Sequence, residues 1–166
     1  TLMQLKVKII GFSKDIKILV GVYLLITSIG FLSALQFVSV TTEGSPKGIE
    51  ENYLGNEEDL QAEELKFAKS EKQVLNIVHA HMLSMAMLFL VLALLVAMTP
   101  IEGFFRKFLL LEPMVSVLLT FGGIYLLTKC ILWMKYVVML SGILMASSFV
   151  VSTIIVVYWL FKKQKI

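Results

Sequence analysis

The sequence predicts an all-α integral membrane protein, a four-transmembrane-helix antiparallel bundle with one acidic outer loop. Of its 166 residues, 58% are hydrophobic and 16% are charged, whereas soluble domains are about 45–50% apolar and about 25% charged. Spanning a bilayer takes about 20 predominantly apolar residues per helix. The strands of a membrane barrel would be shorter and would alternate in polarity, so helices are expected. Four stretches meet the length requirement: Ile16–Val40, Val74–Met98, Phe108–Thr128 and Tyr136–Phe161.

A basic arm, residues 1–15, precedes the first stretch and carries Lys6, Lys8 and Lys14, and a fourth lysine, Lys17, follows at the start of the stretch. Basic residues before an apolar run are also typical of a secretory signal, but a signal has an apolar core of only about 7–15 residues. The run that follows here is much longer. We therefore expect the first helix to be a retained signal anchor and residues 16–166 to form the membrane domain.

The basic residues are distributed unevenly between the two sides of the predicted bundle. With four spans, the arm with Lys17, the second connection and the C-terminal end share one side, which holds nine lysines and arginines against six on the other. By the positive-inside rule, the side with nine is cytoplasmic. The sequence thus predicts a multi-pass protein of the cell inner (plasma) membrane with cytoplasmic N- and C-termini. Topology and lipid phosphates explain these charges, and no nucleic-acid partner is expected.

The outer loop, residues 41–73, holds nine of the 12 acidic residues. Its first half, T-T-E-G-S-P-K-G, consists of turn residues without periodicity. Such a loop is either a solvated connection or a surface that attracts a basic partner, for example a soluble electron carrier. Apolar residues in the rest of the loop can pack against the bundle or a partner: Tyr53, Leu54, Leu60, Leu65 and Phe67.

Ser70 and Gln73 have the spacing of a capping box, which predicts that the second helix begins near Glu71. At 1.5 Å per residue, His79 and His81 then lie roughly 12 to 15 Å along this helix, in its outer half.

The second connection, around T-P-I-E-G, is short, and Glu112-Pro113 is expected at the inner mouth of the third helix, where proline is tolerated in a first turn. Glu112 is interpreted there as an interfacial carboxylate paired with Arg106 and Lys107. A proton carrier is the alternative interpretation.

The third connection, Lys129–Lys135, is a tight outer turn, so helices two, three and four should be antiparallel neighbours. Small residues favour close helix packing at Gly21 with Gly30, at Gly122 with Gly123, and in S-G-x-x-x-A-S-S over residues 141–148. The single cysteine, Cys130, excludes an intramolecular disulfide and a two-cysteine metal site within the chain.

The only two histidines, His79 and His81, lie together inside an apolar helix. Ionisable residues within a span are costly and indicate a functional site with a partner. Residues two apart on a helix point about 200° apart, so the two imidazoles cannot bind one metal ion together. Bonding across helices or a position at headgroup level is the alternative.

Each histidine shares a helix face with a methionine: Met82 follows His79 by three residues and Met85 follows His81 by four. Imidazole with thioether is a ligand set for haem iron or copper(I). Met139, in the fourth helix, is expected at a depth similar to the histidines, which allows a His–Met bridge. The alternative is that the methionines are apolar filler.

The run V-H-A-H with a following Met-Leu resembles the W-H-A-H-E-M-L run of haem- and copper-containing membrane proteins linked to nitric-oxide response. It is also similar to His-x-His helices in small uncharacterised bacterial four-helix membrane proteins. The match is confined to the segment around the histidines and lacks the tryptophan and the glutamate. The resemblance implies that His79 or His81 associates with haem or copper.

Three classes of function follow. The first is a membrane subunit or accessory of an electron-transfer (respiratory) complex, which binds haem b or copper through a helix-two histidine. The second is a structural or assembly subunit without a cofactor, whose histidines bond to a neighbouring subunit or to a quinone carbonyl. The third is a small channel or carrier, which the lack of broken helices disfavours. No pattern indicates a stand-alone enzyme.

Overall fold

The computed structural model describes residues 8–59, 61–62 and 64–162, so Lys6, Leu60 and Glu63 lie outside the described residues. Over the described residues the chain forms helices and no strand, and four of the helices are long and apolar enough to cross a membrane. This confirms the predicted helical membrane bundle. The elements are η1 (Ile9–Gly11), α1 (Lys14–Thr42), α2 (Pro46–Leu54), α3 (Glu71–Ala97), α4 (Gly103–Thr128) and α5 (Met134–Phe161).

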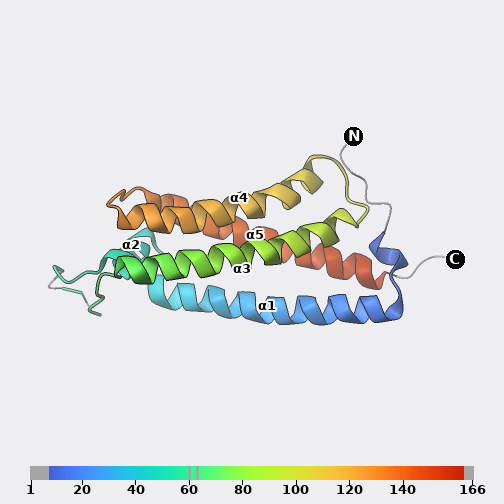
Figure 1. Ribbon diagram of the computed structural model, residues 1–166, viewed down its shortest axis with the longest axis horizontal. Coiled ribbons are helices and arrows are strands. Elements are labelled where there is room, and N and C mark those ends of the chain that lie inside the picture. The colour runs from blue at the N-terminus through green and yellow to red at the C-terminus, as the bar shows by residue number, and fades with distance from the viewer. Residues whose placement is uncertain (1–7, 60, 63, 163–166) are drawn as a thin grey trace.

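The four long helices lie side by side, and α2 lies across one end of the bundle (Figure 1). We call this the loop end; it also holds the described residues 55–59, 61–62 and 64–70 and the α4–α5 turn. The opposite end, here the basic end, holds η1, the start of α1, the α3–α4 connection and the end of α5. As expected from the short connections, α4 packs against both α3 and α5, whereas α1 contacts mainly α2 and α5.

Capping residues set where the first and third helices begin. Ser13 accepts a hydrogen bond from the Ile16 amide at the start of α1. At α3, the Ser70 hydroxyl accepts from the Gln73 amide, and the Gln73 side chain in turn accepts from the Ser70 amide. The predicted capping box and the start at Glu71 are therefore confirmed.

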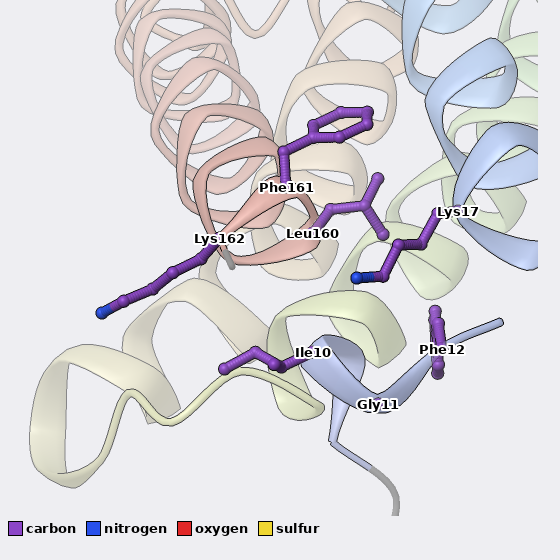
Figure 2. A pocket seen from close by; sticks show the side chains of 7 residues that line it. All are labelled: Ile10, Gly11, Phe12, Lys17, Leu160, Phe161 and Lys162. Atoms are coloured by element: carbon purple, nitrogen blue, oxygen red, sulfur yellow. The ribbon is translucent and has the colours of Figure 1, made fainter. Parts of the chain in front are cut away.

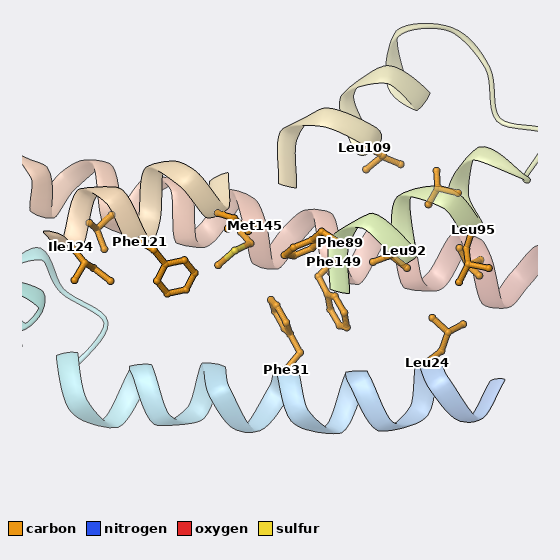
Figure 3. Packing of buried hydrophobic residues seen from close by; sticks show 14 of the residues in the cluster. Leu24, Phe31, Phe89, Leu92, Leu95, Leu109, Phe121, Ile124, Met145 and Phe149 are labelled. Atoms are coloured by element: carbon orange, nitrogen blue, oxygen red, sulfur yellow. The ribbon is translucent and has the colours of Figure 1, made fainter. Parts of the chain in front are cut away.

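An aromatic cluster, Phe31, Phe89 and Phe149, joins three helices at the middle of the bundle (Figure 3). The rings of Phe31 and Phe149 are stacked with centroids 4.1 Å apart, and Phe89 meets each of them edge-on at 6.3 Å. All three side chains are buried. Because only three residues of α1 are buried, Leu24, Phe31 and Thr42, the Phe31 ring is a principal attachment of α1 to the bundle.

Helices α4 and α5 pack closely at positions where their interface contains small residues. A Cβ at Gly123 would lie 2.9 Å from Val138 Cγ2, and the hydroxyls of Thr120 and Ser141 are hydrogen-bonded at 2.7 Å. Close packing was predicted correctly here. The prediction of close packing was wrong at Gly30 and Gly122, where an added Cβ would meet no atom within 4 Å.

The outer loop is more ordered than the turn residues indicated. After the left-handed residues Glu43 and Gly44, Ser45 caps α2 by accepting from the Gly48 amide, and Pro46 occupies the first turn. Proline is well suited to that position because its missing N–H has no helical partner there. The prediction of an irregular segment was therefore wrong from Pro46 onward.

The apolar residues of the loop divide into two groups. Tyr53 and Leu54 pack against the core as predicted, and burial raises the pKa of Tyr53 to about 12. Leu65 and Phe67 are 57% and 69% exposed.

Ion pairs fix the loop to the loop end of the bundle. Lys135 at the start of α5 pairs with Glu50 of α2, and Lys129 pairs with Glu71 at 2.6 Å. The hydrogen bond to Glu71 raises the pKa of Lys129. The Lys129–Glu71 pair is exposed and contributes little energy by itself, whereas the Lys135–Glu50 pair is half-buried.

Glu112 and Pro113 are not at the mouth of a helix, which corrects the sequence-based placement. The third transmembrane helix begins at Gly103, so Pro113 is inside α4, and the first turns of α4 rise away from the bundle in Figure 1. Arg106 and Lys107 are part of the first turns of α4, where long basic side chains can extend toward the headgroups. Proline within a helix removes one backbone hydrogen bond and disfavours straight geometry.

The described part of the N-terminal arm packs against the basic end. Ile9 is fully buried, and its amide donates to the Met98 carbonyl at 3.1 Å. This contact brings the arm, the end of α3 and the end of α5 together, as four spans require.

The two ends of the bundle differ in how their lysines are paired. On the loop end, Lys47, Lys66, Lys129 and Lys135 are each paired with a carboxylate. Among the described residues, no such pair involves a basic residue of the opposite end. The orientation of the termini stays a prediction, based on the count of basic residues on each side.

The natural cysteine tests this orientation without engineering. Cys130 is exposed in the α4–α5 turn, so an impermeant maleimide should label the wild-type protein in intact cells, and Cys130→Ser should abolish the label. On the Cys130→Ser background, a cysteine replacing the exposed Glu102 should react only after the cells are opened. The reverse pattern would place the termini outside.

Candidate functional site

His81 lies in the half of α3 nearer the loop end, with its ring fixed from two sides. Its Nδ1 is 2.8 Å from the Ile77 carbonyl oxygen. A carbonyl oxygen only accepts, so Nδ1 carries the proton and donates it. The ring also packs against Phe121 of α4, with centroids 5.1 Å apart. In a neutral ring this hydrogen bond puts the lone pair on Nε2, and the side chain as a whole is exposed.

His79 is also exposed, on a different face of α3. The two methionines that share faces with the histidines, Met82 and Met85, are half-buried and pack against the core. The structure therefore does not present both members of each His–Met pair on the outer surface. The sequence identified the residues correctly as members of one helix segment but could not show which side chains fill the interior.

Met139 lies at the depth predicted for it. Helices α3 and α5 run in the same direction, and Phe89 contacts Phe149, so residue 139 is about level with residue 79. Met139 packs against the core, whereas His79 is exposed. The depths of His79 and Met139 therefore agree with a His–Met bridge. Their exposure does not, because one side chain faces outward and the other packs in the core.

A second group of polar side chains lies between α4 and α5. Both carboxylate oxygens of Glu112 accept hydrogen bonds, one from the Ser116 hydroxyl and the other from the Ser148 hydroxyl. Arg106 instead donates to the Ala97 carbonyl at 3.0 Å. Among the described residues Glu112 has no basic partner, so the predicted pairing with Arg106 and Lys107 was wrong. The reason is that α4 begins earlier and carries Glu112 inward.

A pocket of about 360 Å³ opens at the basic end between η1, the start of α1 and the end of α5 (Figure 2). Lys17 and Lys162 line it together with the apolar side chains of Phe12 and Leu160. Ammonium groups beside apolar surface at a helix end suit lipid phosphates. This pocket is therefore assigned to the membrane interface.

A family model described as a transmembrane helical domain matches residues 43–166. The chain belongs to this family. The matched region of the transmembrane helical domain comprises α2 to α5 and omits α1, which is also the least buried of the four long helices. No curated protein and no solved structure matches the chain.

Both polar groups belong to the matched domain. Sequence reasoning found the histidines because they stand out in an apolar helix. It missed the link between Glu112 and Ser148, for which the only sequence signal was the serine-rich run 141–148, interpreted as packing.

Proposed function

We propose that this transmembrane helical domain is a membrane subunit or accessory of an electron-transfer (respiratory) complex, and that His81 is its ligand for haem b or copper. The observation that carries the proposal is the hydrogen bond from His81 Nδ1 to the Ile77 carbonyl. Metal-binding histidines commonly donate their second ring N–H to a carbonyl or carboxylate, which fixes the tautomer and the ring orientation. Nε2 of His81 is then directed to accept a metal.

The exposure of both imidazoles supports a site shared with another subunit. His79 and His81 lie eight and ten residues from the start of α3, about 12 to 15 Å along the helix. Polar groups exposed to hydrocarbon at that depth are costly, and a partner subunit would cover them. Since Met82 and Met85 pack inward, the second ligand is most simply supplied by that partner.

Haem iron or copper, when bound, would accept and donate one electron at a time. The chain's own residues would orient the imidazole and exclude water: Phe121 packs against the ring, and the surrounding surface of α3 is apolar. The acidic loop end would be the side that a basic soluble electron carrier approaches.

The alternative is a structural or assembly subunit with no cofactor of its own. In that case Nε2 of His81 would accept a hydrogen bond from a neighbouring subunit, whereas His79 would need its N–H to reach a quinone carbonyl. The exposure of both rings favours this alternative over a small channel or carrier, for which a polar path open at both ends would be expected.

Gentle detergent extraction of the native membrane tests the proposal. The protein should elute within a larger complex that contains haem b by absorbance or copper by elemental analysis. A larger complex with neither would establish the assembly alternative. Recovery only as a monomer with neither cofactor would contradict both.

A further inference from the structure

Among the described residues, Glu112 is the only carboxylate in the interior of a long helix. The other acidic residues of the long helices and their caps are at the ends: Asp15 and Glu71 in first turns, and Glu43 and Glu102 at cap positions. Glu112 is nine residues inside α4, and its partner Ser148 is 14 residues from the start of α5 and 13 from its end. At 1.5 Å per residue, the carboxylate lies close to the middle of the bundle.

The helices around Glu112 provide no countercharge. Between Lys135 and Lys162, α5 has no acidic, basic or histidine residue. The titratable groups of α3 nearest to it are the histidines, and His81 is level with Phe121, about 13 Å along α4 from Glu112. On the basic side, Arg106 bonds to Ala97 and Lys107 is exposed.

The remaining elements do not supply a charge either. Helix α2 packs on the loop end of α4, where Glu50 pairs with Lys135 and Glu51 with Lys47. The one titratable group in the interior of α1 is the Tyr23 hydroxyl, which bonds to the Leu88 carbonyl. A carboxylate without a countercharge is expensive in a medium of low dielectric constant, and protonation removes that cost.

The hydroxyls beside Glu112 form a buried polar environment. Ser116 and Ser148 are buried and occupy both carboxylate oxygens. One turn beyond Ser148 on α5, Ser152 is 1% exposed, and its hydroxyl has no hydrogen-bond partner within the described structure. A hydroxyl can both donate and accept, so Ser152 is available to exchange a hydrogen bond with the carboxyl group or with a water molecule beside it.

We propose that Glu112 is a reversible proton-binding site at the middle of the membrane, held by Ser116 and Ser148. A proton from water adds to one carboxylate oxygen to give the neutral acid, whose O–H donates to one serine hydroxyl while the other serine still donates to it. Release of the proton restores the carboxylate and returns the charge to water. Between α4 and α5, the hydrogen-bonded hydroxyls of Thr120 and Ser141 continue this polar group toward the loop end.

Dicyclohexylcarbodiimide tests the proposal, because this apolar reagent modifies protonated carboxyl groups within membranes. The full chain in native membranes is treated over a range of pH, and the modified peptide is located by mass spectrometry. Glu112 should be labelled, and the labelling should fall as pH rises because the proton is lost. Glu112→Gln keeps the size and hydrogen-bonding capacity of the side chain and should remove the label.

Neighbouring residues serve as matched controls. Ser148→Ala removes one hydroxyl from the carboxyl group and should change the labelling rate at fixed pH by about five- to tenfold, the effect of one hydrogen bond. Ser147→Ala should not, since Ser147 is exposed and bonds to the Ile143 carbonyl. Absence of label on Glu112 at every pH, labelling independent of pH, or protection by sodium ions at constant pH would overturn the proposal. None of these outcomes depends on whether His81 binds a metal.

Discussion

His81→Ala is expected to lower the haem or copper content of the purified complex by more than about 100-fold, a loss larger than that for residues that only orient a ligand. His79→Ala is expected to keep most of the cofactor, because no hydrogen bond within the described residues fixes its ring as Ile77 and Phe121 fix that of His81. The measurements are the Soret absorbance and elemental copper, each normalised to protein.

Two controls separate ligation from a structural role. Ser84→Ala alters the same helix surface one turn away, where Ser84 is exposed and bonds only to the His81 carbonyl, and it should leave the cofactor in place. Added imidazole should partly restore absorbance to the His81→Ala complex, which a loss of packing would not permit. Equal cofactor content in the wild type and His81→Ala would eliminate His81 as a ligand.

Phe149→Ala is expected to lower the free energy of unfolding by about 3 kcal/mol, the usual cost of removing a buried aromatic ring. The ring stacks on Phe31 and meets Phe89 edge-on, so its loss leaves a cavity between α1, α3 and α5. Thermal unfolding in detergent provides the measurement. Because Phe31 is one of few buried residues of α1, proteolysis or hydrogen exchange should reveal α1 loosening before the other helices.

Val150→Ala is the matched control for this loss. Val150 adjoins Phe149 in the chain but is 43% exposed on the outer surface, so its truncation should change stability by less than about 1 kcal/mol. A similar effect of the two substitutions would show that the aromatic cluster does not hold α1 in place.

The membrane spans and the start of α3 could be predicted from the sequence because they depend on local properties. A run of apolar residues must be helical in lipid whatever its neighbours, since its backbone groups have no other partners. The capping box of Ser70 and Gln73 is likewise satisfied within four residues. Isolation in an apolar helix also identified His79 and His81, since an ionisable group there is unusual in any fold.

Contacts between distant segments were decided only by the tertiary structure. Nothing in the neighbourhood of Glu112 indicates that Ser148, 36 residues later, meets its carboxylate; the basic residues before it pointed instead to an ion pair at the membrane surface. The Ile77 carbonyl, a local contact one turn away, determines which ring nitrogen of His81 is free. The position of the ring also depends on Phe121, which belongs to another helix. Helix periodicity tells which residues lie on the same face of a helix. Which other helix that face contacts depends on how the helices pack.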